Sequence, residues 1–177
     1  MARRSKAREL TVQMLYLIDL NPDVDAKAVR AMIEEQLRDI HLADFAWSLF
    51  IRVREVRPQL DASIESVAMH WKISRMPPTD RNIIRLGTFE LMFTDTPPKV
   101  VIDEAVELAK RYGTAQSSQF VNGILDRLIP ESKRTTPSGA HPEIPLKLKD
   151  HPPPDAADVS IEKAAPLPNE IDDDDET

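Results

Sequence analysis

Apolar residues recur along residues 1–134 with the spacing of helices rather than of strands. In the segment 118–128 the aliphatic residues share one helix face at the i, i+3, i+4, i+7 spacing: Val121, Ile124, Leu125 and Leu128. The segment 80–94 is apolar on most faces and 12–18 nearly all round, which indicates buried helices. No sustained period-2 alternation interrupts this pattern. The sequence therefore predicts an all-α helical bundle.

Prolines and a glycine divide this bundle into about seven helices. A fourth helix begins near Pro58, and Gly113 suits the C′ position after the sixth. On the second helix we expect Ala28, Met32 and Leu37 to point inward, and on the fourth Leu60, Ile64, Val67 and Met69. The other helices are expected at about 3–20, 25–39, 43–56, 80–94, 100–112 and 118–129.

The last helix carries an aromatic residue off its core stripe. Phe120 lies roughly 90° from the centre of the stripe, at about 100° per residue, and Gly123 and Arg127 lie on the same flank. A ring, an uncovered stretch of backbone and a guanidinium together suit an unstacked nucleotide. The alternative is a Phe at the edge of the core and a Gly where two helices cross closely.

Two blocks of the sequence resemble a known family. EAVELAKRYG (104–113) is followed by FVNGILD (120–126), and the basic segment 3–10 leads into Val12-Gln13-Met14-Leu15-Tyr16. These features strongly resemble the NusB family of transcription antitermination factors, over about residues 3–130. The resemblance implies two three-helix subdomains sharing a core.

The resemblance also implies partners. It implies binding of single-stranded boxA-like RNA, together with a ribosomal protein called NusE in this role, within the antitermination complex of RNA polymerase. It carries RNA contact over to Tyr16, which the helix pattern alone reads as a core or edge residue. It places partner contacts near the start of the helix at 80–94 and in the turn before the last helix: Asp80, Arg81, Gln116 and Ser117. The alternative is that Asp80 and this turn only cap their helices.

Net charge separates the chain into two parts. The whole chain carries −7, but residues 1–134 carry +1 and residues 135–177 carry −8. The second part has no aromatic residue and holds 8 of the 15 prolines. Such a segment buries too little apolar surface to offset chain entropy. We therefore expect a helical RNA-binding domain at 1–134 and a disordered acidic, Pro-rich tail at 135–177.

The N-terminus holds the densest basic run of the chain: Arg3, Arg4, Lys6 and Arg8. Cations at a helix N-terminus oppose the helix dipole, which weakens a purely structural explanation. Such a run adds counterion release to RNA affinity. We expect these residues to contact RNA, the alternative being a solvated helix end. Arg85 and Glu90 lie in a very apolar helix, where we expect structural ion pairs with neighbouring helices.

Motifs of enzymes are missing from the sequence. The chain has no Cys, and His41 and His70 lack metal-binding spacing. Neither a Gly-rich phosphate loop nor a nucleophile elbow occurs. We expect a protein without catalysis, cofactor or metal. No apolar run approaches the ~18 residues of a membrane span, and no signal-peptide core is present, so we expect a cytoplasmic protein.

Two functions remain open. The first is an adaptor that binds RNA and NusE during antitermination and ribosomal RNA synthesis. The second is a protein-interaction helical module without RNA binding, which uses its acidic tail to attract basic partners. The basic N-terminus and the flank of Phe120, Gly123 and Arg127 favour the first.

Overall fold

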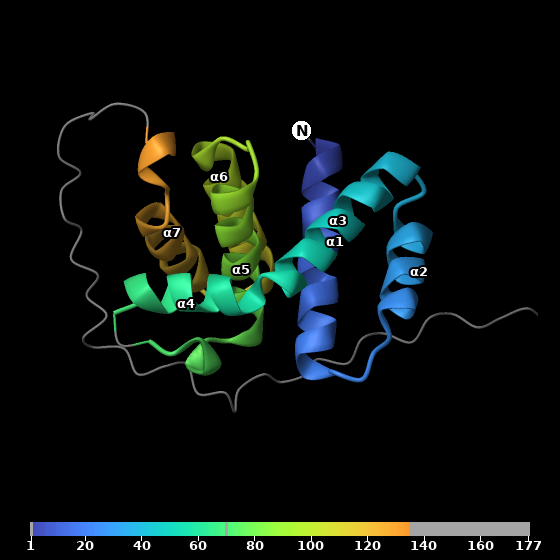
Figure 1. Ribbon diagram of the computed structural model, residues 1–177, viewed down its shortest axis with the longest axis horizontal. Coiled ribbons are helices and arrows are strands. Elements are labelled where there is room, and N and C mark those ends of the chain that lie inside the picture. Colours follow the sequence, from blue (N-terminus) through green and yellow to red (C-terminus); the bar gives the residue numbers. More distant parts are fainter. Residues whose placement is uncertain (1, 70, 135–177) are drawn as a thin grey trace, which may run out of the picture.

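The computed structural model describes residues 2–69 and 71–134, and these residues are helical as predicted (Figure 1). Residues 135–177, for which the acidic tail is predicted, lie outside the described residues. None of the described helices is both long and apolar enough to cross a bilayer. The elements are α1 (Ala2–Leu20), α2 (Ala26–Gln36), α3 (Ile40–Glu55), α4 (Arg57–Val67), α5 (Pro78–Phe93), α6 (Pro98–Tyr112) and α7 (Ser117–Arg127), with two 3-10 turns, η1 (Ile73–Arg75) and η2 (Glu131–Lys133).

The helices form two groups that share one core (Figure 1). In the first group α1 and α2 pack on α3, and in the second α4, α6 and α7 pack around α5. The groups meet where α1 lies against α5. A single cluster of buried side chains runs from Leu10 on α1 to Leu125 on α7. The family resemblance implied two subdomains sharing a core, and the second of them contains four helices rather than three.

The two central helices are α1 and α5. Residues 7–12 of α1 and residues 82–91 of α5 are all buried. A helix covered on every side has no solvated face, so each polar residue in it needs a partner inside the protein. Arg8, Arg85 and Glu90 are therefore inside the molecule and must be paired.

Proline sets the start of three helices. Pro78 and Pro98 lie at the first position of α5 and α6, and α4 also has Pro in its first turn. The first helical residue needs no backbone N–H, so Pro is tolerated there with its φ already helical. Helices α5 and α6 therefore begin two residues earlier than expected from sequence, whereas α4 begins within one residue of the expected Pro58. Asp25 and Asp39 cap α2 and α3 by accepting backbone N–H bonds.

The crossing of α5 and α7 depends on Gly87. A Cβ atom at this position would lie 2.7 Å from Leu125 Cδ1 on α7. Leu125 is itself fully buried, so it has little room to move. The close helix crossing proposed as an alternative for Gly123 thus occurs at Gly87.

Three of the positions expected to point inward are exposed instead. On α2 the buried residues are Val29 and Ile33, whereas Ala28 and Met32 are exposed. Leu37 is buried, as expected, directly after the helix. The apolar residues of this short helix allow two different inward faces. Packing against α3 selects one of them, and the sequence pattern of α2 did not show which. Met69 is exposed and adopts a positive φ of 35° just after α4. Gly113 ends α6 with an extended backbone rather than a left-handed one.

Candidate nucleic-acid interface

The flank of α7 identified from sequence lies partly at the surface. Val121, Ile124 and Leu125 are buried, and Phe120 is half-buried as its off-stripe position predicts. The Phe120 ring packs against Trp71, with 5.9 Å between the ring centroids and 56° between the planes. Trp71 therefore supports the inner side of this ring. Sequence reasoning did not anticipate this contact.

The other two members of the flank are accessible. Gly123 is partly exposed and Arg127 is exposed. Arg127 Nη1 donates to the carbonyl oxygen of Val67, at the end of α4, over 3.2 Å. Only one of the five N–H donors of the guanidinium is used in that bond. Phosphate pairing by the remaining donors is chemically possible.

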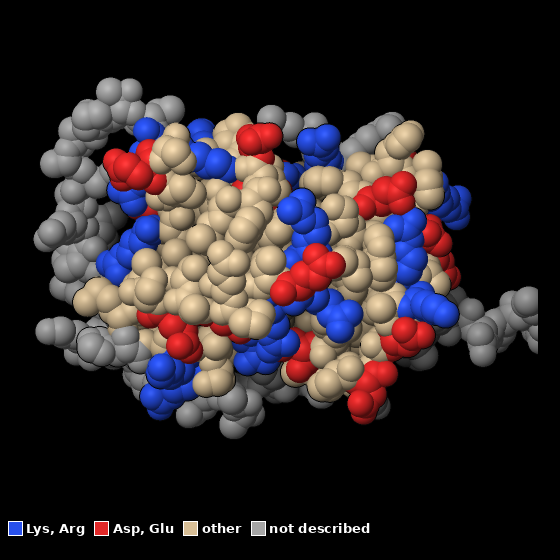
Figure 2. All heavy atoms as spheres, in the orientation of Figure 1, with Lys and Arg blue, Asp and Glu red and all other residues tan. Residues whose placement is uncertain are grey.

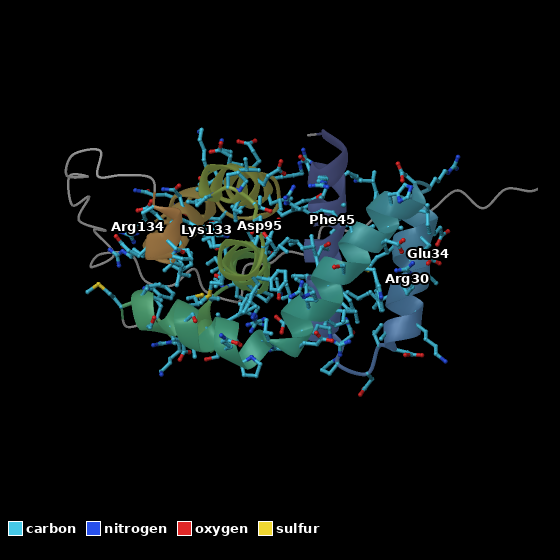
Figure 3. The ribbon with its side chains drawn as sticks, turned by 45° about the horizontal axis from the view of Figure 1, so that its top comes forward. Arg30, Glu34, Phe45, Asp95, Lys133 and Arg134 are labelled. Carbon is cyan, nitrogen blue, oxygen red and sulfur yellow. The ribbon has the colours of Figure 1, made fainter. Side chains whose placement is uncertain are left out.

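The basic N-terminal residues point in different directions. The side chain of Arg3 lies outside the described residues. Arg4 is exposed, and its guanidinium lies 5.2 Å from the centre of the Phe45 ring. Phe45 lies where α3 crosses the N-terminal half of α1 (Figure 3). The Lys6 side chain is 53% exposed and forms an ion pair with Glu9 on the next turn, at 3.2 Å.

Arg8 is a correction to the predicted RNA surface. It is only 4% exposed, and its Nε and Nη2 donate to the carboxylate of Glu90 over 2.8 to 3.1 Å. Burial alone lowers the pKa of Arg8, but the Glu90 contact outweighs it, and the net pKa is raised. A guanidinium held this way inside the core cannot reach an RNA phosphate. We therefore place Arg8 beneath the proposed surface rather than on it.

The ion pairs predicted for α5 are confirmed. Glu90 pairs with Arg8 on α1, and Arg85 donates to Asp61 on α4 over 2.7 and 2.9 Å. Asp19, near the end of α1, accepts from Arg81 over 2.6 Å. Desolvation raises the pKa of Asp19, but hydrogen bonds, first from Arg81, more than reverse this and lower it. These pairs lock α1, α4 and α5 into one framework.

Two of the predicted partner residues are brought together, but inside the protein. Ser117 Oγ donates to Asp80 Oδ2 over 2.9 Å, and both residues are at least 96% buried. No described residue donates a hydrogen bond to Asp80 Oδ1. Burial raises the pKa of this carboxyl, opposed by the Ser117 hydrogen bond. Asp80 and Ser117 thus join the starts of α5 and α7 and do not present themselves to a partner.

The same contact shapes the turn before α7. Ser117 Oγ accepts a hydrogen bond from the backbone N–H of Thr114 over 2.8 Å. A Cβ at Gly113 would lie 2.4 Å from Ser117 Cβ, so only glycine fits this turn. Gln116 is exposed immediately before α7, and Arg81 is half-buried beside Asp19. Of the four predicted partner residues, Gln116 is the exposed one, and the Arg81 side chain is 16% exposed.

A group missed by sequence reasoning joins α1 to the end of α6. The Tyr112 hydroxyl and Arg111 Nη1 both donate to Glu9 Oε1, the latter over 3.0 Å. Gln13 on α1 donates to the Tyr112 oxygen over 3.1 Å. Tyr16 is half-buried one turn further along α1. Residues 9 and 112 are too far apart in sequence for any helix pattern to connect them.

Charged side chains of both signs are interspersed on the molecular face drawn in Figure 2. A broad area without charged side chains covers part of α4 and α5 in that view. This face therefore carries no continuous basic stripe. On this face, affinity for a polyanion has to come from individual cations and aromatic rings rather than from one strong field.

A cleft of about 290 Å³ lies at the junction of the α5–α6 loop and η2, where Asp95, Lys133 and Arg134 are found (Figure 3). Its lining mixes an acid with two bases, and Lys133 donates to the carbonyl oxygen of Thr94. Arg134 lies near Glu131, at 3.7 Å. Both bases of the cleft thus have partners, and it offers no aromatic ring, so it is a weaker candidate for binding RNA than the surface of α1, α6 and α7.

The model of the NusB family matches residues 5–130. The chain belongs to the NusB family. A transcription antitermination protein NusB from Anaeromyxobacter dehalogenans is 40% identical over 137 residues, covering 75% of this chain and 96% of that relative. The NusB of a Nitratiruptor species is also 40% identical, over 134 residues, with the same coverage of both chains.

Solved structures agree with this assignment. NusB of T. maritima superposes with a TM-score of 0.68 at 34% identity, covering 73% of this chain and 95% of that one. A structure of antitermination factors NusB and NusE in complex with double-stranded RNA gives a TM-score of 0.66 at 28% identity. That match covers 73% of this chain and 97% of the neighbour.

Proposed function

We propose that this protein is a transcription antitermination factor that binds boxA-type RNA in nascent ribosomal RNA transcripts jointly with NusE and so assists RNA polymerase processivity. The observation that supports this most is its similarity, over residues 5–130, to a family that includes a solved complex of NusB, NusE and RNA. We propose that it acts as an adaptor rather than as an enzyme. We place it in the cytoplasm, because transcription supplies its RNA there.

The RNA surface in this proposal combines rings and cations from α1 and α7. Phe120 provides a ring supported by Trp71, next to the partly exposed backbone of Gly123. Stacking and close backbone approach of this kind recognise unpaired bases without a duplex groove. The cations and the second ring are Arg3, Arg4, Lys6, Arg127 and Tyr16.

We place the NusE contact at the starts of α5 and α7. Gln116 provides an exposed side chain and Arg81 a partly exposed one, while the Asp80–Ser117 hydrogen bond joins the two helix starts. The two sites share α7, since Gln116 precedes Phe120 by about one helical turn. A partner bound at Gln116 therefore lies close to RNA bound at Phe120.

A titration of single-stranded boxA-like RNA into the full chain, with and without NusE, tests the proposal. The helical domain has a net charge near zero, so we expect weak binding by the chain alone and tighter binding with the basic ribosomal protein. By linkage, RNA should tighten the protein pair by the same factor. A shuffled RNA of equal length is the matched control.

Equal RNA affinity with and without NusE would contradict the adaptor mechanism. Binding to NusE without measurable binding to either RNA would instead support the protein-interaction module.

A further inference from the structure

Tyr112 presents an aromatic ring on the same side of the molecule as the basic start of α1. Tyr112 is 39% exposed, so part of its ring is open to solvent. Lys6, Gln13 and Tyr16 lie on one face of α1, at spacings of seven and three residues. Gln13, between the other two, donates to the Tyr112 oxygen. The Tyr112 ring thus extends the proposed RNA surface from α1 to the end of α6.

The carboxylate of Glu9 fixes the orientation of this ring. Its side chain is only 9% exposed and accepts from Tyr112, Arg111 and Lys6. Desolvation raises the pKa of Glu9, but hydrogen bonds, that of Tyr112 first, outweigh it and lower the pKa. The carboxylate is therefore ionised at neutral pH and holds two cations and a phenol around it. A ring and cations already held in place lose little entropy when a ligand binds.

Exposed cations lie beside Tyr112 in the sequence and around its partner Glu9. The side chains of Lys6 and Arg111 are 53% and 62% exposed, although both contact Glu9. Lys110 is 56% exposed and pairs with Glu107 at 2.6 Å. An exposed ring flanked by cations suits a base and its neighbouring phosphates, because the ring stacks on the base while the cations pair with the backbone.

We propose that Tyr112 is a second base-stacking residue for single-stranded RNA and that Glu9 is the residue that positions it. This inference rests on the proposed RNA-binding function and extends it from α7 across the end of α6 to α1. The hydroxyl of Tyr112 serves as its anchor, and the ring face is what the RNA meets. The bound strand then runs between Phe120 and the basic start of α1.

RNA binding by the full chain with NusE tests this, using Tyr112→Ala, Tyr112→Phe and Tyr112→Trp. Replacement by Ala should weaken binding about tenfold, within the usual effect of one stacked base. The Phe variant keeps the ring and should lose less. Met92→Ala is the matched control, since Met92 is similarly exposed, at 37%, and lies at the C-terminal end of α5. It should bind RNA like the parent chain.

Three further readouts separate stacking from a merely structural role. Tyr112→Trp keeps a ring but lacks the hydroxyl anchor, so its RNA affinity should lie between those of the parent chain and Tyr112→Ala, and it should add RNA-dependent fluorescence quenching beyond that of the parent chain. Tyr112→Ala should leave the salt dependence of binding unchanged, whereas Lys6→Ala should reduce its slope by about one phosphate contact. Glu9→Gln should weaken RNA binding in the parent chain but add little to Tyr112→Ala, as expected for residues that act through each other.

Failure of this inference differs from failure of the proposed function. If Phe120→Ala weakens RNA binding while Tyr112→Ala binds like Met92→Ala, Tyr112 is not part of the RNA surface and the proposed function stands. If Tyr112→Ala weakens NusE binding and leaves RNA affinity unchanged, the ring belongs to a protein contact and the inference is overturned. If the parent chain binds no RNA, the proposed function itself fails.

Discussion

At the scale of single residues, the environment of a side chain decides its role more than its chemical type does. Arg8 and Lys6 belong to the same basic run, yet Arg8 is bound by Glu90 in the core while Lys6 is exposed. Phe120 and Leu125 lie on the same helix, but only Leu125 is completely buried. Substitutions at these positions should therefore affect stability and RNA binding in different proportions.

Phe120→Ala should weaken RNA binding by about 1–3 kcal/mol, the loss of one stacked base. Its cost in stability should be smaller than the roughly 2–5 kcal/mol of Leu125→Ala, because the Phe120 ring is half-buried while Leu125 fills the core. Thermal melts and RNA titrations of both variants test this. Equal destabilisation by the two variants, with RNA affinity following stability, would make Phe120 a core residue.

Asp80→Asn should remove the loss of stability that ionisation of the buried Asp80 carboxyl causes as pH rises. The folded pKa of Asp80 is raised, so the folded state favours the neutral acid. Ionisation therefore destabilises the fold as pH rises from the unfolded pKa, near ~3.9, through the raised folded pKa. Asn is neutral and still accepts from Ser117. The free energy of unfolding should be measured with denaturant from pH 3 to 7. As pH rises, it should increasingly favour the variant over the parent.

A difference that stays constant across this pH range would mean that the Asp80 carboxyl titrates as it does in the unfolded chain. Ser117→Ala provides a second check, because it removes the one hydrogen bond that lowers the pKa of Asp80. Its stability should fall more steeply with rising pH than that of the parent.

At the scale of elements, α7 serves two requirements at once. Its buried stripe packs closely across α5 at Gly87, and its outer flank presents Phe120, Gly123 and Arg127. Glycine suits positions 87 and 123 for different reasons. At Gly87 the neighbouring side chain leaves no room for a Cβ atom, whereas Gly123 lies on the partly exposed flank.

Alanine should therefore have opposite effects on stability at the two glycines. Gly87→Ala should destabilise by about 1–3 kcal/mol, because its Cβ overpacks the buried Leu125 side chain. Gly123→Ala should stabilise by up to ~1 kcal/mol through helix propensity while weakening RNA binding. Chemical denaturation and RNA titration measure the two effects. Unchanged RNA affinity in a stabilised Gly123→Ala variant would remove this glycine from the proposed surface.

At the scale of the whole molecule, charge is distributed very unevenly along the chain. Residues 135–177 carry −8 against +1 for residues 1–134. A tethered acidic segment has a high effective concentration near the basic start of α1. It should therefore compete with RNA for the same cations.

Deleting residues 135–177 should raise RNA affinity at low salt and leave the melting temperature nearly unchanged. The gain should shrink as salt rises past ~0.15 M, where the screening length is about 8 Å. RNA titrations of the full and shortened chains at several salt concentrations test this. Indistinguishable binding curves at about 50 mM salt, where screening is weak, would show that the tail does not compete.

The sequence by itself determined the helical class, the number of segments and the family. These depend on local periodicity, on Pro and Gly, and on two contiguous blocks, EAVELAKRYG and FVNGILD. It also placed Phe120 off the core stripe, because helical geometry fixes the angle between residues of one helix. The ion pairs of Arg85 and Glu90 followed from the cost of burying charge.

The tertiary structure alone decided which side chains are accessible and which meet. Arg8 pairs with Glu90 across 82 residues, and Glu9 with Tyr112 across 103. Periodicity along one helix gives no information on what lies opposite it, so a basic run could not reveal that one of its members is buried. The same holds for Asp80 and Ser117, which were each predicted at a surface and instead bind each other inside the protein. Such pairings arise only when helices distant in sequence pack side by side.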